Sequence, residues 1–315
     1  SPEDAFADFE TYPYYIQKTP GTYKPEVGDY VRSSLKRGLE IEQKIGVNPY
    51  QLGVIGSTDA HTALASAEEN NFHGKLATDS KPANKAGFSD EEGRPFGWAM
   101  SASGLAAVWA EDNTRESIVA AMRRREVYAS TGPRIGVRFY AGWRLSAEDL
   151  GAADFPVNLA DRAVPMGGEL LAADGDSPVF LIAATADPMT ANLDRIQVVK
   201  GWVDNDGRSY EKVFDVAWGG NDRLNADGSL KPVGNTVNLA TAHYDNSIGA
   251  AELTSVWRDP EFDPALSAFY YVRVLQIPTP RHSLYDKIAL GGDVDTRRPD
   301  VIQERAYTSS IWYTP

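Results

Sequence analysis

The feature that most constrains the fold is a series of strand-length apolar segments in the second half of the chain. They cover residues 135–140, 179–186, 196–203, 210–218, 253–257 and 269–276, and clusters of Gly, Pro, Asn and Asp separate them. Segments of this length and punctuation are typical of antiparallel β-sandwiches. Asp204-Asn205-Asp206-Gly207, between two of the segments, predicts a hairpin turn. We therefore expect residues 135–315 to form a β-rich, sandwich-like domain.

Before residue 135 the pattern alternates between helix and strand. Apolar residues recur at helical spacing from Val31 to Ile45, with Asp29 as the expected N-cap and Gly46 as the stop. The short apolar segment 52–55 is typical of a buried parallel strand. Residues 105–110 predict a second strand, and 113–125 a capped helix. We expect residues 1–134 to form an α/β unit that packs directly on the β domain.

Composition excludes several classes of function. The 315 residues are 42% hydrophobic, enough for two structural units, and the net charge of -13 opposes binding to nucleic acid or anionic membranes. No apolar segment approaches the roughly 20 residues that a membrane span needs. Because the chain has no cysteine, a metal ion would have to be held by His, Asp and Glu. The compartment stays open, with a periplasmic or secreted location favoured over a cytoplasmic one.

One short segment carries the residues most suited to chemistry. The apolar segment 52–55 leads into Gly56-Ser57-Thr58-Asp59-Ala60-His61. If the strand continues, a spacing of two places Asp59 and His61 on one face, where a carboxylate and an imidazole can bind a divalent ion. A competing interpretation is that Asp59 caps the following turn and that His61 is a hydrogen-bonded surface residue. The polar stretch from Thr62 to Gly97 is long enough to be an active-site loop.

These residues also carry a resemblance to known proteins. Residues 57–61 (Ser-Thr-Asp-Ala-His) resemble the last metal-binding motif of the PHP (polymerase and histidinol phosphatase) superfamily, whose distorted barrels hold two or three metal ions and hydrolyse phosphoesters. Residues 53–61, 67–75 and 125–135 resemble, in that order, a bacterial family of uncharacterised PHP-related proteins. The likeness continues more loosely through residues 164–168 and 305–313.

The resemblance implies a fold and a function. The fold would be α/β plus β: residues 1–134 as the C-terminal portion of a PHP-like distorted (β/α) barrel with the Asp-x-His motif, followed by the antiparallel β-sandwich-like domain 135–315. The function would be that of a metal-dependent hydrolase, a phosphoesterase acting on a small-molecule ester. Asp59 and His61 would be ligands of zinc, manganese or iron.

The chain departs from the superfamily pattern in its ligand set. A complete site also needs an early His-x-His motif and ligands from middle strands, whereas the other histidines are His73, His243 and His282, none of them paired. The chain begins at Ser1 instead of methionine. We therefore expect a missing N-terminal barrel segment to provide the remaining strands and ligands, and this chain alone to be catalytically inert.

Weaker candidates surround the Asp-x-His motif. Glu68, Glu69 and His73 follow it on the polar loop and could contact substrate or support the metal ligands, although a solvated loop is the simpler interpretation. Arg134 could clamp an anionic ester, or could form an ordinary salt bridge.

Two other functions compete with hydrolysis. The β domain could bind a glycan or a protein while a non-catalytic barrel remnant supports it, or the chain could be a metal-free assembly module. Trp202, Trp218, Trp257 and Trp312 could line a carbohydrate platform, but aromatic residues at strand spacing more often belong to the core.

Overall fold

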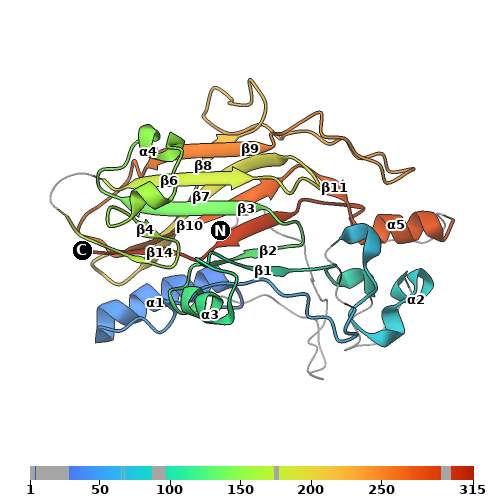
Figure 1. Ribbon diagram of the computed structural model, residues 1–315, viewed down its shortest axis with the longest axis horizontal. Helices are drawn as coiled ribbons and strands as arrows, with labels where there is room; N and C mark the ends of the chain where they lie inside the picture. The colour runs from blue at the N-terminus through green and yellow to red at the C-terminus, as the bar shows by residue number, and fades with distance from the viewer. Residues whose placement is uncertain are drawn as a thin grey trace.

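The computed structural model describes residues 4, 28–64, 66, 68–86, 97–173, 177–291 and 299–315. Figure 1 shows strands filling most of the molecule, with α1 and α3 below them and α2 and α5 at one end. The helices are α1 Val31–Ile45, α2 Pro82–Ala86, α3 Arg115–Arg123, α4 Ala147–Gly151 and α5 His282–Ala289, with 3-10 turns η1 Glu69–Asn71, η2 Ala77–Asp79, η3 Gly97–Ala99 and η4 Val157–Leu159. The strands are β1 Leu105–Val108, β2 Val127–Ser130, β3 Gly136–Gly142, β4 Val164–Pro165, β5 Glu169–Leu171, β6 Val179–Thr185, β7 Leu193–Val203, β8 Ser209–Trp218, β9 Glu252–Arg258, β10 Ala268–Gln276, β11 Thr279–Pro280, β12 Val301–Ile302, β13 Arg305–Thr308 and β14 Ile311–Thr314.

Two sheets contain most of the strands. The larger has the order β1-β2-β13-β10-β14-β5, and β7 and β8 extend it from the other edge of β10. The smaller has the order β4-β3-β6-β9. The pairings within both sheets are antiparallel except that of β14 with β5. A short β11–β12 pair lies beside α5 in Figure 1.

The main core lies between the two sheets. Every second residue of the facing strands points into it, as the period of two along a strand requires. Val137 and Phe139 of β3 and Ile182 of β6 meet Tyr270 and Val272 of β10 in one fully buried cluster. The two sheets therefore pack face to face.

The opposite face of the larger sheet is covered by α1. Phe269 and Tyr271, which alternate with the core residues of β10, pack with Leu35 and Leu39 of α1. All nine residues of β10 are buried because one face contacts the smaller sheet and the other contacts a helix. This explains why seven of the nine residues of β10 are apolar instead of every second one.

Several local predictions are confirmed. The helix covers Val31–Ile45 and ends at Gly46, whose φ of 76° is the left-handed conformation that glycine favours. The hairpin turn joins β7 to β8, where the Asp204 carboxylate accepts hydrogen bonds from the backbone of Asp206 and Arg208. The expected N-cap is wrong: Tyr30, not Asp29, occupies that position, with no side-chain cap.

The expected barrel is wrong. The described strands form open, mainly antiparallel sheets instead of a closed ring of parallel strand and helix units. Residues 52–55 have no strand conformation, and Leu52 and Ile55 are 58% and 57% exposed. The other expected strand forms as β1. It pairs antiparallel with β2, and α3 connects the two strands. Of the expected alternation, α1, β1 and α3 form, but the strand at 52–55 does not, and β1 pairs in the wrong direction for a barrel.

The larger sheet includes strands from both sides of residue 135. β2 pairs with β13, so Ser130 lies opposite Ala306 and Tyr128 opposite Thr308. Tyr128 also belongs to the main core. None of the described helices combines the length and apolar character that crossing a bilayer requires.

Candidate functional site

Close backbone contacts at glycine hold residues 53–61 against the β1–β2 pair. A Cβ added at Gly56 would lie 2.6 Å from the carbonyl oxygen of Leu105 and 2.7 Å from that of Ser130. The Gly56 N–H donates to the Leu105 carbonyl at 3.2 Å. A Cβ at Gly104 would lie 2.5 Å from a carbonyl oxygen of the same segment. Because glycine has no side chain, the backbone of this segment can lie in direct contact with the backbone of β1 and β2. This contact fixes the position at which the Asp-x-His motif begins.

The structure brings Asp59 and His61 together on the surface. Asp59 Oδ1 lies 3.5 Å from His61 Nε2, and the two side chains are 67% and 64% exposed. Asp59 has a φ of 51°, a left-handed conformation that Asp tolerates better than most residues, and its N–H donates to Ser57 Oγ at 3.3 Å. A turn, instead of the expected continuing strand, thus aims the two side chains at each other.

A buried lysine supports the turn from below. The backbone N–H of His61 donates to the Lys75 carbonyl at 2.8 Å, and Lys75 Nζ lies 3.7 Å from Asp59 Oδ2. The Lys75 side chain is only 5% exposed, and this burial lowers its pKa to about 8. Asp59 therefore has an imidazole beside one carboxylate oxygen and an ammonium group beside the other.

The motif supplies two metal-ligating side chains of its own. Among the described residues, no group of three or more His, Asp and Glu side chains is arranged to hold one ion. Two ligands leave several coordination positions of a divalent ion to water or to other groups.

A second polar cluster joins the loop after the motif to the C-terminal strands. The Glu69 carboxylate accepts a hydrogen bond of 2.6 Å from the His282 backbone N–H at the start of α5. It also shares a side-chain hydrogen bond with Glu304, and Thr131 Oγ1 donates to Glu304 Oε2. Burial raises the pKa of Glu69, and burial together with the neighbouring Glu69 raises the pKa of Glu304 well above its usual value. Two carboxyl groups in contact in a buried place therefore favour one proton between them over ionisation of both.

Buried polar side chains around α5 enclose this acid pair. His282 Nε2 lies 2.8 Å from the Met100 carbonyl oxygen, which also accepts a 3.0 Å hydrogen bond from Arg281. Burial, reinforced by the Arg281 charge, lowers the pKa of His282 well below its usual value. Lys85 Nζ lies 3.1 Å from an oxygen of Asp286. The surroundings of the acid pair are closed and extensively hydrogen bonded, which suits a structural tie between segments.

The other predicted site residues lie apart from the motif contacts. Glu68 and His73 are exposed on the loop, and part of that loop, residues 65, 67 and 87–96, lies outside the described residues. Arg134 is exposed, and its backbone N–H donates to Asp187 at 2.8 Å. Within the described part of the chain, no contact joins the Arg134 side chain to Asp59 or His61, so an ester clamp at Arg134 has no geometric support.

Three of the four tryptophans named for the β region pack against the hydrophobic clusters, and Trp218, at the end of β8, is half-buried. Trp312 is 2% exposed beneath α1, and Trp257 packs against the main core. Trp202 is partly buried and stacks on Tyr210 with ring centroids 5.6 Å apart.

Sequence reasoning missed Lys75 and Glu304. Lys75 closes the segment 67–75 that was compared with the bacterial family, and Glu304 directly precedes the segment 305–313. Both lie inside or beside segments that already carried the resemblance, which was the available signal. No local pattern shows that Glu304 meets Glu69, because Glu69 reaches it through the packing of η1 against α5, far along the chain.

Comparison with known proteins gives one match. A family model described as "Protein of unknown function (DUF3604)" matches residues 1–315. No curated protein and no solved structure matches the chain.

Proposed function

Since the chain belongs to the family described as "Protein of unknown function (DUF3604)", we propose from its own residues that Asp59 and His61 bind a divalent metal ion. We propose further that the protein acts as a metal-dependent ester hydrolase, with a phosphoester as substrate. Zinc, manganese and iron are the candidate ions, because the chain offers oxygen and nitrogen ligands but no thiolate.

The observation that carries the proposal is the separation of the two ligand atoms. Two atoms that each lie about 2.1 Å from an ion, at a tetrahedral angle, are about 3.4 Å apart. Asp59 Oδ1 and His61 Nε2 are 3.5 Å apart and both are open to solvent. They can therefore reach one ion without rearranging the backbone turn. The resemblance of residues 57–61 to a metal-binding motif supports the same assignment.

Lys75 adds to the chemistry of this corner. Its ammonium group beside Asp59 offers positive charge to an anionic ester. When bound, a divalent ion supplies a water of lowered pKa and polarises an ester oxygen. The turn holds the Asp59 carboxylate and the His61 imidazole in position, and Lys75 balances the negative charge of the substrate.

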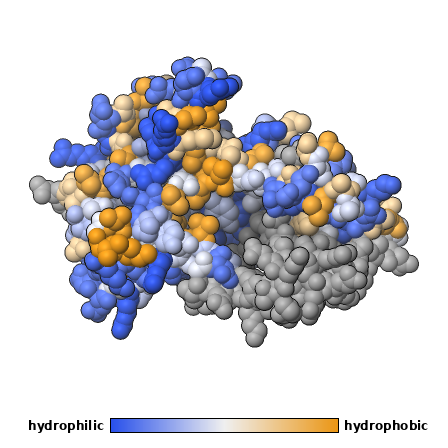
Figure 2. Space-filling model, turned by 90° about the horizontal axis from the view of Figure 1, so that it is seen from below, coloured by the Kyte–Doolittle hydropathy of each residue, from blue (hydrophilic) through white to orange (hydrophobic). Residues whose placement is uncertain are grey.

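We propose that the remaining ligands come from polypeptide beyond the described residues, attached to this chain or separate from it. Two ligands are too few for a hydrolytic centre. Leu52, Ile55 and Leu64, on either side of the motif, are 58%, 57% and 62% exposed, which suits contact with further polypeptide. Figure 2 shows hydrophobic groups exposed among hydrophilic ones on the face that carries α1 and α3.

The test is a hydrolysis assay with a generic phosphodiester, bis(4-nitrophenyl) phosphate, in manganese, zinc or iron. The full gene product should turn over the ester only with metal, and Asp59→Asn or His61→Ala should each lower the rate at least tenfold, as loss of a ligand does. Asp206→Asn and His243→Ala remove the same groups from exposed positions elsewhere and should leave the rate unchanged. Turnover that survives both site variants would refute the assignment; a complete lack of turnover would favour the binding-module function.

A further inference from the structure

Two arginine side chains converge on one carboxylate, on the face of the larger sheet that α1 covers. Arg273 of β10 donates to both oxygens of Asp4, at 3.1 Å from Nη1 and at 2.5 Å from Nη2. Arg32 of α1 lies 2.7 Å from Asp4 Oδ2 through its own Nη2. The side chains of Arg273, Arg32 and Asp4 are 3%, 16% and 10% exposed. The Asp4 carboxylate is therefore held, largely out of water, between a helix and a strand.

Other side chains keep the two guanidinium groups in this orientation. Arg32 Nε donates to the Tyr271 hydroxyl at 2.8 Å, and Arg273 Nε donates to Gln197 Oε1 at 2.8 Å. Each Nε is thus used on the sheet, and terminal Nη groups are left to face Asp4. Groups that are oriented before a ligand binds lose little conformational freedom when it does. The pair is pre-organised for a carboxylate.

Asp4 supplies a negative charge that the rest of the site does not. Glu211 is shared between Arg32 Nη1, at 3.2 Å, and Lys36, at 3.0 Å. Among the described residues, no carboxylate other than Asp4 lies within 4.0 Å of Arg273. Burial opposes the charged form of Asp4, but the hydrogen bonds and charges of Arg273 and Arg32 hold its pKa below the usual value. The site is therefore suited to an anion.

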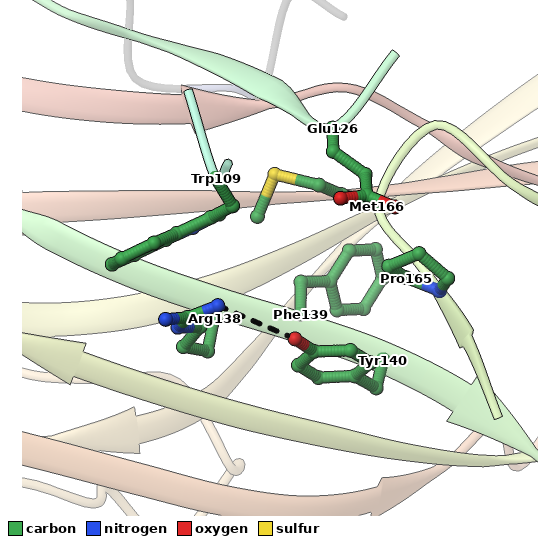
Figure 3. Close-up of a pocket in the computed structure, with 7 residues that line it drawn as sticks. All are labelled: Trp109, Glu126, Arg138, Phe139, Tyr140, Pro165 and Met166. Atoms are coloured by element: carbon green, nitrogen blue, oxygen red, sulfur yellow. Dashed lines mark hydrogen bonds between the residues drawn. The ribbon is translucent and has the colours of Figure 1, made fainter. Parts of the chain in front are cut away.

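Arg138 is held in a different way and provides a control. Figure 3 shows its guanidinium group facing the Trp109 ring and lying beside Tyr140. The central carbon lies 3.3 Å from the centre of that ring, and Nη1 lies 3.5 Å from Tyr140 Oη. Arg138 belongs to β3 of the smaller sheet, which packs on the opposite face of the larger sheet from α1.

We propose that Arg32 and Arg273 form a carboxylate-binding site, for which Asp4 is the ligand that the chain itself provides. A free carboxylate of the size of formate takes the same place when the Asp4 side chain is shortened. Asp4→Ala removes the carboxylate and leaves its space, while Tyr271 and Gln197 still orient the arginines. The proposal is independent of the metal site, because it uses none of the same side chains.

The experiment measures thermal unfolding of the full chain with formate as the probe, chloride at equal ionic strength as the reference and formamide as the uncharged comparison. Asp4→Ala should unfold at a lower temperature than the unaltered protein, because it leaves buried guanidinium charge without its partner. Formate should raise that temperature in a saturable way. At about 100 times its Kd it should shift the folding equilibrium about 100-fold, and formamide should not.

Matched variants separate the site from a general salt effect. The unaltered protein and Asp206→Ala, which removes an exposed carboxylate, should unfold at the same temperature in formate as in chloride. Asp4→Ala/Arg273→Gln should lose the response to formate, and Asp4→Ala/Arg138→Gln should keep it. If Asp4→Ala is unfolded in chloride, formate should recover the folded fraction on refolding from urea, and formamide should not.

Two results would overturn the proposal. One is an equal response of Asp4→Ala and Asp206→Ala to formate. The other is the absence of any response of Asp4→Ala to formate, whether the variant is folded at the start or is refolded from urea.

Discussion

At the scale of single residues, the position of the proposed metal ligands depends on glycines, which have no side chain and so allow close backbone contact. Gly56 touches backbone oxygens on two strands, so nothing on a flexible side chain can move aside for an added methyl group. Gly53 makes a similar approach, with the Val127 side chain 2.9 Å from its would-be Cβ. Gly53 and Gly56 are therefore explained by close contact of this segment with its neighbours, and not by a buried strand.

We expect Gly56→Ala to destabilise the fold by roughly 1–3 kcal/mol, the usual cost of forcing atoms into a packed site. Urea unfolding measures this difference directly. Gly151→Ala is the matched control: its Cβ would meet nothing within 4 Å, and in the helix α4 alanine should be neutral or stabilising by about 0.5–1 kcal/mol. Equal stability of Gly56→Ala and the unaltered protein would show that the close approach does not determine the turn.

At the scale of elements, the shared proton of Glu69 and Glu304 connects η1, α5 and the start of β13. Glu304 sits in a buried position where ionisation is unfavourable, so the folded protein keeps the proton that an unfolded chain would release near the ordinary pKa of Glu. The folded pKa is raised. The resulting stabilisation is fully present below the unfolded pKa and is lost as the pH rises toward the raised folded pKa.

Glu304→Gln should remove this pH dependence. Glutamine can accept from Thr131 and donate to Glu69, as a protonated carboxyl does, but it has no proton to lose. From about pH 5 upward, the unfolding free energy of the unaltered protein should fall relative to the variant by up to about 1.4 kcal/mol per pH unit. Urea titrations between pH 5 and 8 measure the difference. The exposed Glu116→Gln of α3 should run parallel to the unaltered protein, and parallel curves for Glu304→Gln would contradict the shared proton.

At the scale of the whole molecule, features fixed by local signals were predictable and features fixed by long-range pairing were not. The helical spacing and Gly46 are sufficient to place α1, and Asp204–Gly207 to place the β7–β8 turn. Antiparallel pairing of β1 with β2, and of β2 with β13, has no local signal. Because the sequence does not reveal this pairing, its alternation of helix and strand predicted part of a barrel.

The site follows the same division. Asp59 and His61 could be found because a spacing of two in one short segment determines that they are neighbours. Lys75 approaches Asp59 only through the fold of the intervening loop, and Glu69 meets Glu304 only because η1 packs against α5.

The central claim is that Asp59 and His61 hold one metal ion, and a crystal of the protein soaked in manganese tests it most directly. The anomalous difference map should show a peak about 2.1 Å from both Asp59 Oδ1 and His61 Nε2, a distance typical of such ligands. The same map from Asp59→Asn should lack the peak. A map with no peak between these two atoms, or with one that persists in Asp59→Asn, would contradict the account.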